Sequence, residues 1–444
     1  MGRRPKDYFK NKIKRPKMKT ILQAPKGMPD ILPEENLLRR KIFKVVEDLA
    51  NFYGFGQIET PILEETKLFL HGTGPTSDIV QKQMFTLKTP GKDFLALRPE
   101  FTPNIVRAYL ENGLYNNPKP VKLFAWGPVF RYEQPQRGRS RQFWQCNFEI
   151  LGSADPIYDA LTMQLFYNLF TELKLKNLII DINTLGCDNC RPLWHKNLKN
   201  YFRSKRRFLC TDCKNRLSTN PLRILDCKNE SCQSLKNGAP KMIDFLCPEC
   251  RKHFKQVLEY LEILGLPYNI NHYLVRGLDY YTKTVFEIRL VDDNLALCGG
   301  GRYDYLVEML GGKPTPAVGG AAGIERLVEV LKKNNYKVEN TFKPKVFLIA
   351  IGDLAKQQAL KYLETLRKVK IPAAESFAHE SLKAQLRQAD KAEIPFVIII
   401  GQKEAMDDTI ILRDMKASTQ EVIVGEKMVD ELKKRFKNDN IANA

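Results

Sequence analysis

The sequence has no run of about 18 consecutive apolar residues, the length that a membrane-spanning helix requires. Its longest apolar stretch, Ile394–Gly401, is short enough to be a buried strand. The basic N-terminus has no apolar segment behind it, so the pattern of a secretory signal is lacking. No internal repeat is visible. We therefore expect a cytoplasmic protein with no membrane partner, and the 444 residues predict two or three domains.

The net charge of +20 is unevenly distributed along the chain. Residues 1–20 carry +8 and residues 187–255 carry +10, whereas residues 343–444 carry +3 and the remainder carries −1. Lys and Arg neutralise phosphates, so a nucleic acid partner would account for the two basic segments. Charge that only keeps the protein soluble is the alternative. Residues 1–20 are also poor in apolar side chains, which predicts a basic mobile extension.

Eight of the ten cysteines lie in the second basic segment, as four near-neighbour pairs. Without a secretory signal, such pairs favour metal ligands or reduced thiols over disulfides. Two closely spaced thiolates can reach one tetrahedral ion, so four pairs are compatible with two structural zinc sites of four cysteines each. Ordinary reduced thiols in a helical insertion are the alternative. The pairs are Cys187 and Cys190, Cys210 and Cys213, Cys227 and Cys232, and Cys247 and Cys250.

Apolar periodicity places secondary structure through the rest of the chain. The predicted helices of the first part are Glu34–Phe52, Pro156–Leu173, Tyr303–Leu310 and Ile324–Lys332, and its strands are 121–131, 141–151, 284–291 and 294–299. After a polar linker at Lys332–Lys343, strands alternate with helices, which predicts a compact α/β domain. Its strands are Lys345–Ile351, Ile394–Gly401 and Thr409–Arg413, and its helices are Ala355–Lys368, Ser381–Lys391 and Glu426–Phe436.

Four short motifs combine charged side chains with glycine. Phe130–Glu133 closes a predicted strand, and an arginine there can bind a phosphate through two hydrogen bonds. Gly319–Leu327 places small residues before a helix, which allows the backbone to approach a ligand closely. Leu274–Thr282 joins a cation, a carboxylate and two phenols, and Cys298–Asp304 contains three consecutive glycines. Each motif alone also fits a salt bridge, a packed junction or a turn, whereas the combination indicates a ligand site.

These motifs resemble those of a known family. Phe130–Glu133 resembles motif 2 of class II aminoacyl-tRNA synthetases, and Gly319–Leu327 resembles their motif 3. Leu274–Thr282 and Cys298–Asp304 look like the two segments peculiar to histidyl-tRNA synthetases. Pro25–Asp30 and Leu97–Pro103 are similar to the same family, and the resemblance spans roughly residues 21–440.

The resemblance implies an α+β class II synthetase catalytic domain, an antiparallel sheet with helices, over residues 21–186 and 256–335. A basic Cys-rich insertion at 187–255 would interrupt it, and a C-terminal α/β anticodon-binding domain would occupy 343–444. A homodimer is expected from the family. The implied activity is that of a histidine–tRNA ligase, which uses ATP with Mg²⁺ to convert L-histidine to histidyl-adenylate and pyrophosphate. Histidine then passes to the 3′ end of tRNA(His).

The resemblance also assigns roles to individual residues. Arg131 would bind the α-phosphate and Arg326 the γ-phosphate, while Glu133 would face the adenine amine. Arg276 would lie between the substrate carboxylate and the α-phosphate. For histidine, Glu100 and Thr102 would bind the α-amino group, Gln145 the backbone, and Glu149 and Tyr281 the imidazole, with Tyr280 lining the pocket. Gln136 and Arg141 are the candidates for reading the extra 5′ guanosine of the tRNA.

Two residues depart from the family pattern, since Phe101 stands where Gly is frequent and Trp144 where His is frequent. Both flank expected substrate contacts, so the resemblance leaves the fine shape of the pocket open. The family is not generally a zinc family, and none of the paired cysteines belongs to the adenylation motifs, so we expect catalysis to be independent of a metal in the insertion. Two other interpretations are a catalytically silent paralogue, similar to the regulatory subunit of ATP phosphoribosyltransferase, and an RNA-binding or zinc-module protein.

Overall fold

The structure is a computed structural model that describes residues 22–293, 295–338, 343–378 and 381–442. The chain divides into two compact units, residues 1–338 and 339–444. The basic extension predicted at residues 1–20 lies outside the described residues. Within the described ranges, no helix has the length and apolar character needed to cross a membrane.

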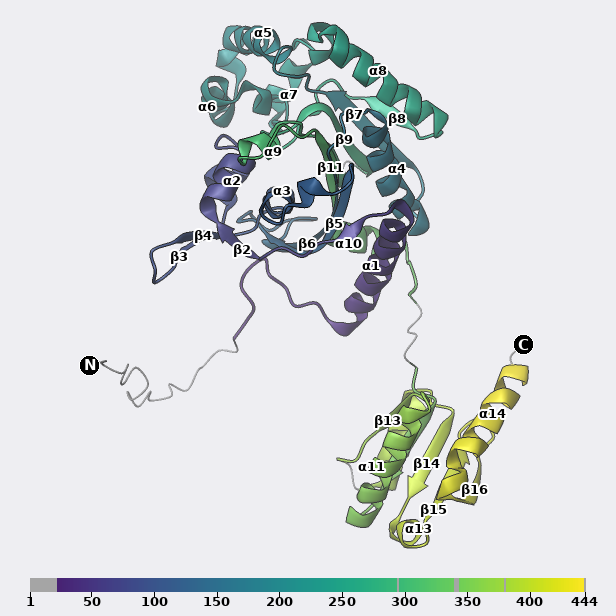
Figure 1. Cartoon of the computed structure of the whole chain (residues 1–444). Coiled ribbons are helices and arrows are strands. Elements are labelled where there is room, and N and C mark those ends of the chain that lie inside the picture. Colours follow the sequence, from purple (N-terminus) through teal and green to yellow (C-terminus); the bar gives the residue numbers. More distant parts are fainter. Residues whose placement is uncertain (1–21, 294, 339–342, 379–380, 443–444) are drawn as a thin grey trace, which may run out of the picture. The chain divides into compact units, whose positions relative to one another are not determined.

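An eight-stranded sheet forms the centre of the first unit (Figure 1). The strand order is β1-β5-β6-β11-β10-β9-β7-β8, and neighbours are antiparallel except for the pairs β1/β5 and β7/β8. The predicted antiparallel catalytic sheet is thereby confirmed. The strands are β1 (Gly56–Gln57), β5 (Val121–Phe130), β6 (Gln142–Leu151), β7 (Leu178–Thr184), β8 (Tyr268–Ile270), β9 (Thr282–Leu290), β10 (Ala296–Arg302) and β11 (Ala317–Gly323).

Each face of this sheet has its own apolar core, because successive side chains of a strand point to opposite faces. In β5, Phe124 joins one core, while Leu123 and Ala125 join the other. Helices α1 (Pro33–Tyr53), α4 (Ile157–Glu172), α8 (Pro248–Ile263) and α10 (Ile324–Lys333) contribute to the first core. Helices α3 (Thr102–Glu111) and α9 (Leu306–Met309) contribute to the second. Nearby lie α2 (Thr66–Gly72), the π-helix Ile79–Gln83, the 3-10 helix Leu114–Asn116 and a small sheet of β2 (Leu63–Glu65), β3 (Thr86–Lys88) and β4 (Phe94–Leu97).

Helix α1 illustrates how the sequence directs this packing. Its side chains Leu38, Ile42, Val45 and Val46 recur at helical spacing, and all four are buried against the sheet. The helix ends at Gly54, whose φ of 71° is a left-handed conformation that glycine adopts without steric cost. The predicted helix Glu34–Phe52 is therefore confirmed to within a residue at each end.

The two glycine-rich motifs form neighbouring antiparallel strands, β10 and β11, in which Gly300 lies opposite Gly320. A Cβ atom on Gly300 would lie 2.7 Å from Gly320 Cα, so the two backbones approach too closely for any side chain. The glycines of Cys298–Asp304 thus allow close backbone approach to β11, and the register of β10 against β9 also shifts between Gly301 and Arg302. The predicted helix at Tyr303–Leu310 is wrong at its start, because α9 begins only at Leu306. Tyr303 itself is buried and bonded to Glu149.

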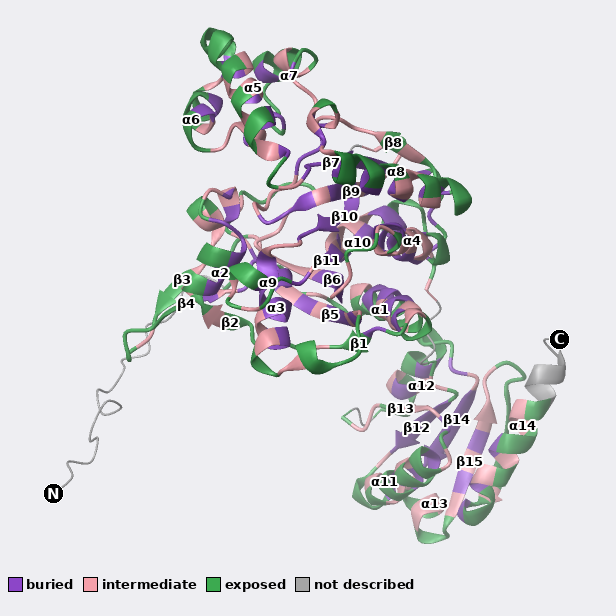
Figure 2. Ribbon diagram, turned by 45° about the horizontal axis from the view of Figure 1, so that its top comes forward, coloured by how far each residue is buried: buried purple, intermediate pink, exposed green. Residues whose placement is uncertain are grey.

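The Cys-rich insertion is largely helical and gathers above the sheet (Figure 2). It consists of α5 (Arg191–Ser204), α6 (Thr211–Thr219), α7 (Glu230–Lys236) and the 3-10 helices Arg206–Phe208, Pro221–Ile224 and Met242–Phe245. Helix α8 begins at the last cysteine pair and continues to Ile263, where its residues Val257 and Leu261 are buried in the catalytic core. One rigid helix thus joins the insertion to the catalytic body.

The second unit is an α/β domain, as predicted. Its sheet has the order β13-β12-β14-β15-β16, in which β13, β12 and β14 are parallel and the last two strands are antiparallel additions. The strands β13 and β16 and the helix α13 were not predicted. The elements are β12 (Val346–Ala350), α11 (Asp353–Lys368), β13 (Ala373–Glu375), α12 (Leu382–Lys391), β14 (Phe396–Ile400), α13 (Gln402–Met406), β15 (Thr409–Asp414), β16 (Thr419–Val424), the 3-10 helix Gly425–Lys427 and α14 (Met428–Ala442).

Candidate active site

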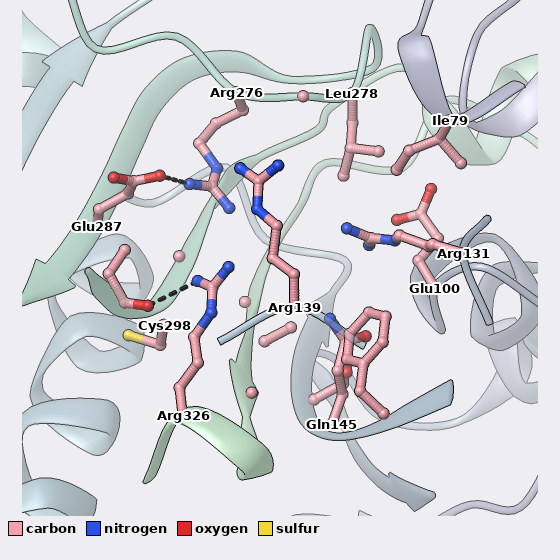
Figure 3. A pocket seen from close by; sticks show the side chains of 18 of the residues that line it. Ile79, Glu100, Arg131, Arg139, Gln145, Arg276, Leu278, Glu287, Cys298 and Arg326 are labelled. Atoms are coloured by element: carbon pink, nitrogen blue, oxygen red, sulfur yellow. Dashed lines mark hydrogen bonds and ion pairs between the residues drawn. The ribbon is translucent and has the colours of Figure 1, made fainter. Parts of the chain in front are cut away.

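A cavity opens over strands β6, β10 and β11, and four arginines line it: Arg131, Arg139, Arg276 and Arg326. In Figure 3 the guanidinium groups of Arg139, Arg276 and Arg326 converge on one side, and Arg131 stands opposite them beside Glu100. The four side chains come from three separate parts of the chain, since Arg131 and Arg139 both lie in the loop between β5 and β6. Such a concentration of cations in one concave site suits a polyanionic ligand.

The local structure fixes two of these arginines through backbone carbonyls. Arg131, just after β5, donates from Nε to the carbonyl oxygen of Pro99 at 2.9 Å. Arg326, in the first turn of α10, donates from Nη1 to the carbonyl oxygen of Ala296 at 2.7 Å. Burial, and then the positive charges of Arg139 and Arg131, lower the pKa of Arg326. These cations repel one another, so binding of a phosphate chain would relieve their repulsion.

Arg276 is held in a different way. Its Nη1 pairs with the carboxylate of Glu287, which projects from the adjacent strand β9. The guanidinium lies flat against Gly299, because a Cβ atom there would be only 2.5 Å from Arg276 Cζ, Nη1 and Nη2. The middle of the motif Cys298–Asp304 therefore leaves room for the arginine of the motif Leu274–Thr282.

The other end of the cavity is acidic and phenolic. Glu100 accepts hydrogen bonds from Thr73 Oγ1 at 2.6 Å and from Tyr280 Oη at 2.8 Å. Burial raises the pKa of Glu100. The rings of Tyr280 and Tyr281 pack with their centroids 4.7 Å apart. This region offers several hydrogen-bonding groups within a small space, next to the arginines.

Most of the residues expected at the site are brought together by the fold. The lining of the cavity includes Glu100, Thr102, Arg131, Glu133, Gln145, Arg276, Tyr280, Tyr281 and Arg326. Glu149 is not part of this lining. It lies beneath the floor with no exposed surface, and it accepts hydrogen bonds from Thr102 Oγ1 at 2.7 Å and from Tyr303 Oη. Burial raises the pKa of Glu149 to about 7.

Gln136 and Arg141 also lie outside the cavity lining, in the hairpin loop after β5. Gln136 is exposed, and its backbone exchanges hydrogen bonds with that of Arg139. The guanidinium of Arg141 packs over the ring of Tyr132, with Cζ 3.9 Å from the ring centroid. These two residues therefore belong to the same loop as Gly138, Arg139 and Ser140, which line the cavity.

Arg139 and Glu287 are among the lining residues that were not predicted from the sequence. Arg139 was one of several arginines in a polar loop, and only the tight turn that joins its amide to the carbonyl of Gln136 turns it inward. Glu287 stands alone in the apolar strand segment TVFEIRLV, so an isolated carboxylate in a predicted strand was the available signal.

Neither residue that departs from the family pattern lines the cavity. Phe101 is buried, with the Cζ atom of Arg98 lying 4.2 Å from its ring centroid. Trp144 packs beside Trp126, and its amide donates to Glu325 at 2.9 Å.

The eight cysteines of the insertion form two groups of four, and within each group all the sulfur atoms lie within 4.8 Å of one another. One group contains Cys187, Cys190, Cys247 and Cys250, and the other contains Cys210, Cys213, Cys227 and Cys232. None of the eight belongs to the cavity over β6, β10 and β11. All are free thiols.

Comparison with known proteins places these features in a family. The family description "Histidyl-tRNA synthetase" matches residues 27–187 and 229–327, and "Anticodon binding domain" matches 345–435. The Histidine–tRNA ligase of Desulfitobacterium hafniense is 42% identical over 421 residues, which cover 94% of this chain and 99% of that protein. That of Pelotomaculum thermopropionicum is 44% identical over 405 residues, covering 91% and 95%.

Solved structures agree with the sequence comparison. Apo Staphylococcus aureus histidyl-tRNA synthetase is 34% identical and superposes with a TM-score of 0.76, covering 93% of this chain and all of that one. A protein of Bacillus halodurans described as an ATP phosphoribosyltransferase regulatory subunit/histidyl-tRNA synthetase shares the fold, at 22% identity and a TM-score of 0.60. The family matches, the relatives that are 42–44% identical over more than 90% of this chain, and the solved structure all point to one family. The chain belongs to the histidyl-tRNA synthetase family.

Proposed function

We propose that this protein is a histidine–tRNA ligase, which forms histidyl-adenylate and pyrophosphate from L-histidine and ATP and then transfers histidine to tRNA(His). The observation that carries the proposal is a single cavity lined both by four arginines and by Glu100, Tyr280 and Tyr281. The arginines suit a triphosphate, and the acidic and phenolic end suits a small zwitterion with a hydrogen-bonding side chain.

ATP binds along the arginine side of the cavity. Arg131 holds the α-phosphate and Arg326 the γ-phosphate end, while Glu133 accepts from the adenine amine. Their positions support these roles, since all three line the cavity and Arg326 is fixed by two backbone carbonyls, those of Ala296 and Gly138. Arg139, which lies in Figure 3 between Arg131 and the pair formed by Arg276 and Arg326, adds a further cation for the phosphates.

Arg276 stabilises the attack step. A carboxylate oxygen of histidine forms a bond to the α-phosphorus, and the bond from that phosphorus to the bridging oxygen breaks, releasing pyrophosphate. Two anions must approach closely, so a fixed cation between them lowers the barrier by more than it stabilises the ground state. Glu287 and the flat contact with Gly299 hold this cation in one place.

Histidine occupies the opposite end of the cavity. Glu100 and Thr102 bind its α-amino group, Gln145 positions its backbone, and Tyr280 lines the pocket. Tyr281 and Glu149 read the imidazole. Glu149 already accepts from Thr102 and Tyr303, but each carboxylate oxygen has two lone pairs and can accept again. A site built to pair both ring nitrogens rejects amino acids that lack them.

Mg²⁺ would accompany ATP, as in class II synthetases generally. The carboxylates of Glu133 and Glu287 line the cavity, but each already pairs with an arginine, Arg139 and Arg276 respectively. This set fits an ion held mainly by phosphates, with one of these carboxylates as a protein ligand, rather than an all-protein cage. When bound, the ion neutralises phosphate charge.

The tRNA contacts several regions of the chain. Gln136 and Arg141 in the loop after β5 read the extra 5′ guanosine, the basic insertion contacts the acceptor arm, and the domain of residues 345–435 binds the anticodon. The protein works in the cytoplasm as a homodimer, as expected for the family.

Charging of tRNA(His) tests the complete reaction. Protein incubated with ATP, Mg²⁺, labelled histidine and a tRNA(His) transcript should produce acid-precipitable label, whereas a transcript for another amino acid should not. A catalytically silent paralogue would give no label with either transcript. That alternative is disfavoured because Arg131, Arg276 and Arg326 are all present and residues 345–435 match an anticodon-binding domain.

A further inference from the structure

The cysteines of the insertion pair across the sequence in a nested order. The first and last pairs form the outer group, Cys187, Cys190, Cys247 and Cys250. The two middle pairs form the inner group, Cys210, Cys213, Cys227 and Cys232. One group therefore joins the two ends of the insertion in sequence, and the other joins two segments within it. The match to the family description omits residues 188–228, which include the inner group's first three cysteines.

The distances between sulfur atoms are those of a tetrahedral metal site. Cys187 Sγ lies 3.7 Å from Cys190 Sγ and 3.9 Å from Cys247 Sγ, and Cys210 Sγ lies 3.8 Å from Cys227 Sγ. Four sulfurs around zinc, each about 2.3 Å from the ion, lie about 3.8 Å apart. A disulfide would bring a pair to about 2.05 Å. The observed distances between sulfur atoms therefore fit a four-cysteine metal site and exclude a disulfide between these pairs.

The backbone around both groups is arranged to stabilise thiolates. The amide of Cys247 donates to Cys190 Sγ at 3.1 Å, and the amide of Cys210 donates to Cys232 Sγ at 3.3 Å. Helix α8 begins directly after Cys247 and helix α6 directly after Cys210, so both lie at helix N-termini, where negative charge is favoured. Backbone donors of this kind commonly support metal-bound sulfur.

We propose that each group binds one structural Zn²⁺, and that the inner ion holds in place the segment that positions the loop of Arg276. The segment in question is residues 214–226, which lies between Cys213 and Cys227 and so has both ends tied to the inner site. Short helices in a strongly basic segment gain much of their folding free energy from such ions.

Arginine and asparagine side chains of residues 214–226 form hydrogen bonds with the catalytic body. Arg216 Nη2 donates to Asp78 Oδ2 at 3.1 Å, next to the π-helix that borders the cavity. Asn220 Nδ2 donates to Asp279 Oδ1 at 3.2 Å, within the motif Leu274–Thr282. Arg223, only 6% exposed, donates from Nη1 to the carbonyl oxygen of Arg276 at 3.3 Å and from Nη2 to that of Gly277.

These contacts revise one expectation from the sequence, that catalysis is independent of a metal in the insertion. Arg223 donates a hydrogen bond to the main chain of Arg276, the residue that stabilises the attack step. Arg223 is therefore a positioning residue. The inner ion fixes the ends of residues 214–226, and this segment in turn holds the main chain of Arg276 in position. This positioning role rests on the proposed function, whereas the metal content does not.

The first experiment measures metal in the full-length protein purified without added metal. Elemental analysis should find about two Zn²⁺ per chain, as expected for two four-cysteine sites. Cys250→Ser and Cys213→Ser should each reduce this to about one, and Cys146→Ala, a buried cysteine outside both groups, should leave it unchanged. A content of one or less in the unsubstituted protein, or iron in place of zinc, overturns the two-site assignment.

The second experiment tests positioning without disturbing a cysteine. Arg223→Met should retain both zinc ions and the full burst amplitude of histidyl-adenylate, while the single-turnover rate falls at least about tenfold, since a small misplacement of a catalytic group is costly. Arg223→Lys, which keeps a donor, should recover part of the rate. The matched control is Arg203→Met, because Arg203 is exposed on α5.

The possible outcomes test the positioning role of Arg223, the proposed function and the zinc sites separately. A single-turnover rate of Arg223→Met within twofold of the unsubstituted protein, or a loss of burst amplitude at unchanged rate, overturns the positioning role. If the unsubstituted protein forms no adenylate at all, the proposed function fails, and the zinc content still decides the metal sites on its own.

Discussion

Replacement of Gly299 by alanine should disable adenylation while leaving the fold intact. A Cβ atom there would lie 2.5 Å from Cζ, Nη1 and Nη2 of Arg276. Carbon atoms in contact normally stand about 3.5 Å apart, so the guanidinium must move by about 1 Å. A misplacement of that size lowers the rate of catalysis about 100-fold. The corresponding rise in activation free energy is about 2.7 kcal/mol.

The backbone of Gly299 gives no reason for a loss of stability. Gly299 is in a regular part of β10, opposite Ala321 on one side and Glu287 on the other, and its φ is not in the left-handed region. The melting temperature of Gly299→Ala should therefore stay close to that of the unsubstituted protein. Gly300→Ala should instead lower the melting temperature, because its Cβ would meet the backbone of Gly319 and Gly320. Backbone atoms, unlike the end of a side chain, cannot rotate away.

Single-turnover formation of histidyl-adenylate, measured alongside thermal unfolding, tests this reasoning. Gly56→Ala is the matched control, since the nearest atom to its Cβ would be 3.9 Å away. An adenylation rate for Gly299→Ala within threefold of the unsubstituted protein would refute the argument that Arg276 acts from the position seen here. A large fall in melting temperature for this variant would refute the claim that the crowding is confined to a side chain.

Three further changes test other parts of the site. Arg276→Ala should lower adenylation by a factor of about 100 to 1000 with the fold intact, the usual loss when one fixed group that stabilises the transition state is removed, and near-normal pyrophosphate exchange would show the role is wrong. Glu149→Gln should raise KM for histidine more than KM for ATP. Because burial raises the pKa of Glu149 from its ordinary 4.5 to about 7, ionised Glu149 destabilises the ligand-free fold. The unfolding free energy of the unsubstituted protein should therefore fall, relative to that of Glu149→Gln, as pH rises from about 4.5 to 7; parallel pH profiles would contradict this. Deletion of residues 343–444 should spare histidine activation and weaken charging of tRNA(His), and undiminished charging would contradict the assignment of that domain.

Motifs predicted the site best where a side chain's direction follows from its element. Arg326 lies in the first turn of a helix that follows a strand, and Arg131 comes directly after another strand. The fold class brings the ends of these two strands to the same side of the sheet, so it predicts that the two arginines meet. Arg139 could not be predicted in the same way, because a turn in a polar loop decides whether it faces the cavity or solvent.

Glu149 shows the limit of alternation along a strand. Gln145, Asn147 and Glu149 occupy one face of β6, and the first two line the cavity. Glu149 does not, because Tyr303 bonds to it and Gly319 of the neighbouring strand leaves it room to turn down. The spacing of the cysteines likewise predicted pairs but not which pairs combine, since four pairs can form two groups in several ways and only the path of the helices selects the nested one.

The most direct test of the central claim is amino-acid-dependent exchange of labelled pyrophosphate into ATP in the absence of tRNA. A cavity lined by Arg131, Arg276 and Arg326 together with Glu100 and Tyr281 predicts rapid exchange with L-histidine and none above background with other amino acids. A protein that retains its fold and ATP affinity but shows no histidine-dependent exchange would contradict the account, because a silent paralogue or an RNA-binding protein would give that result.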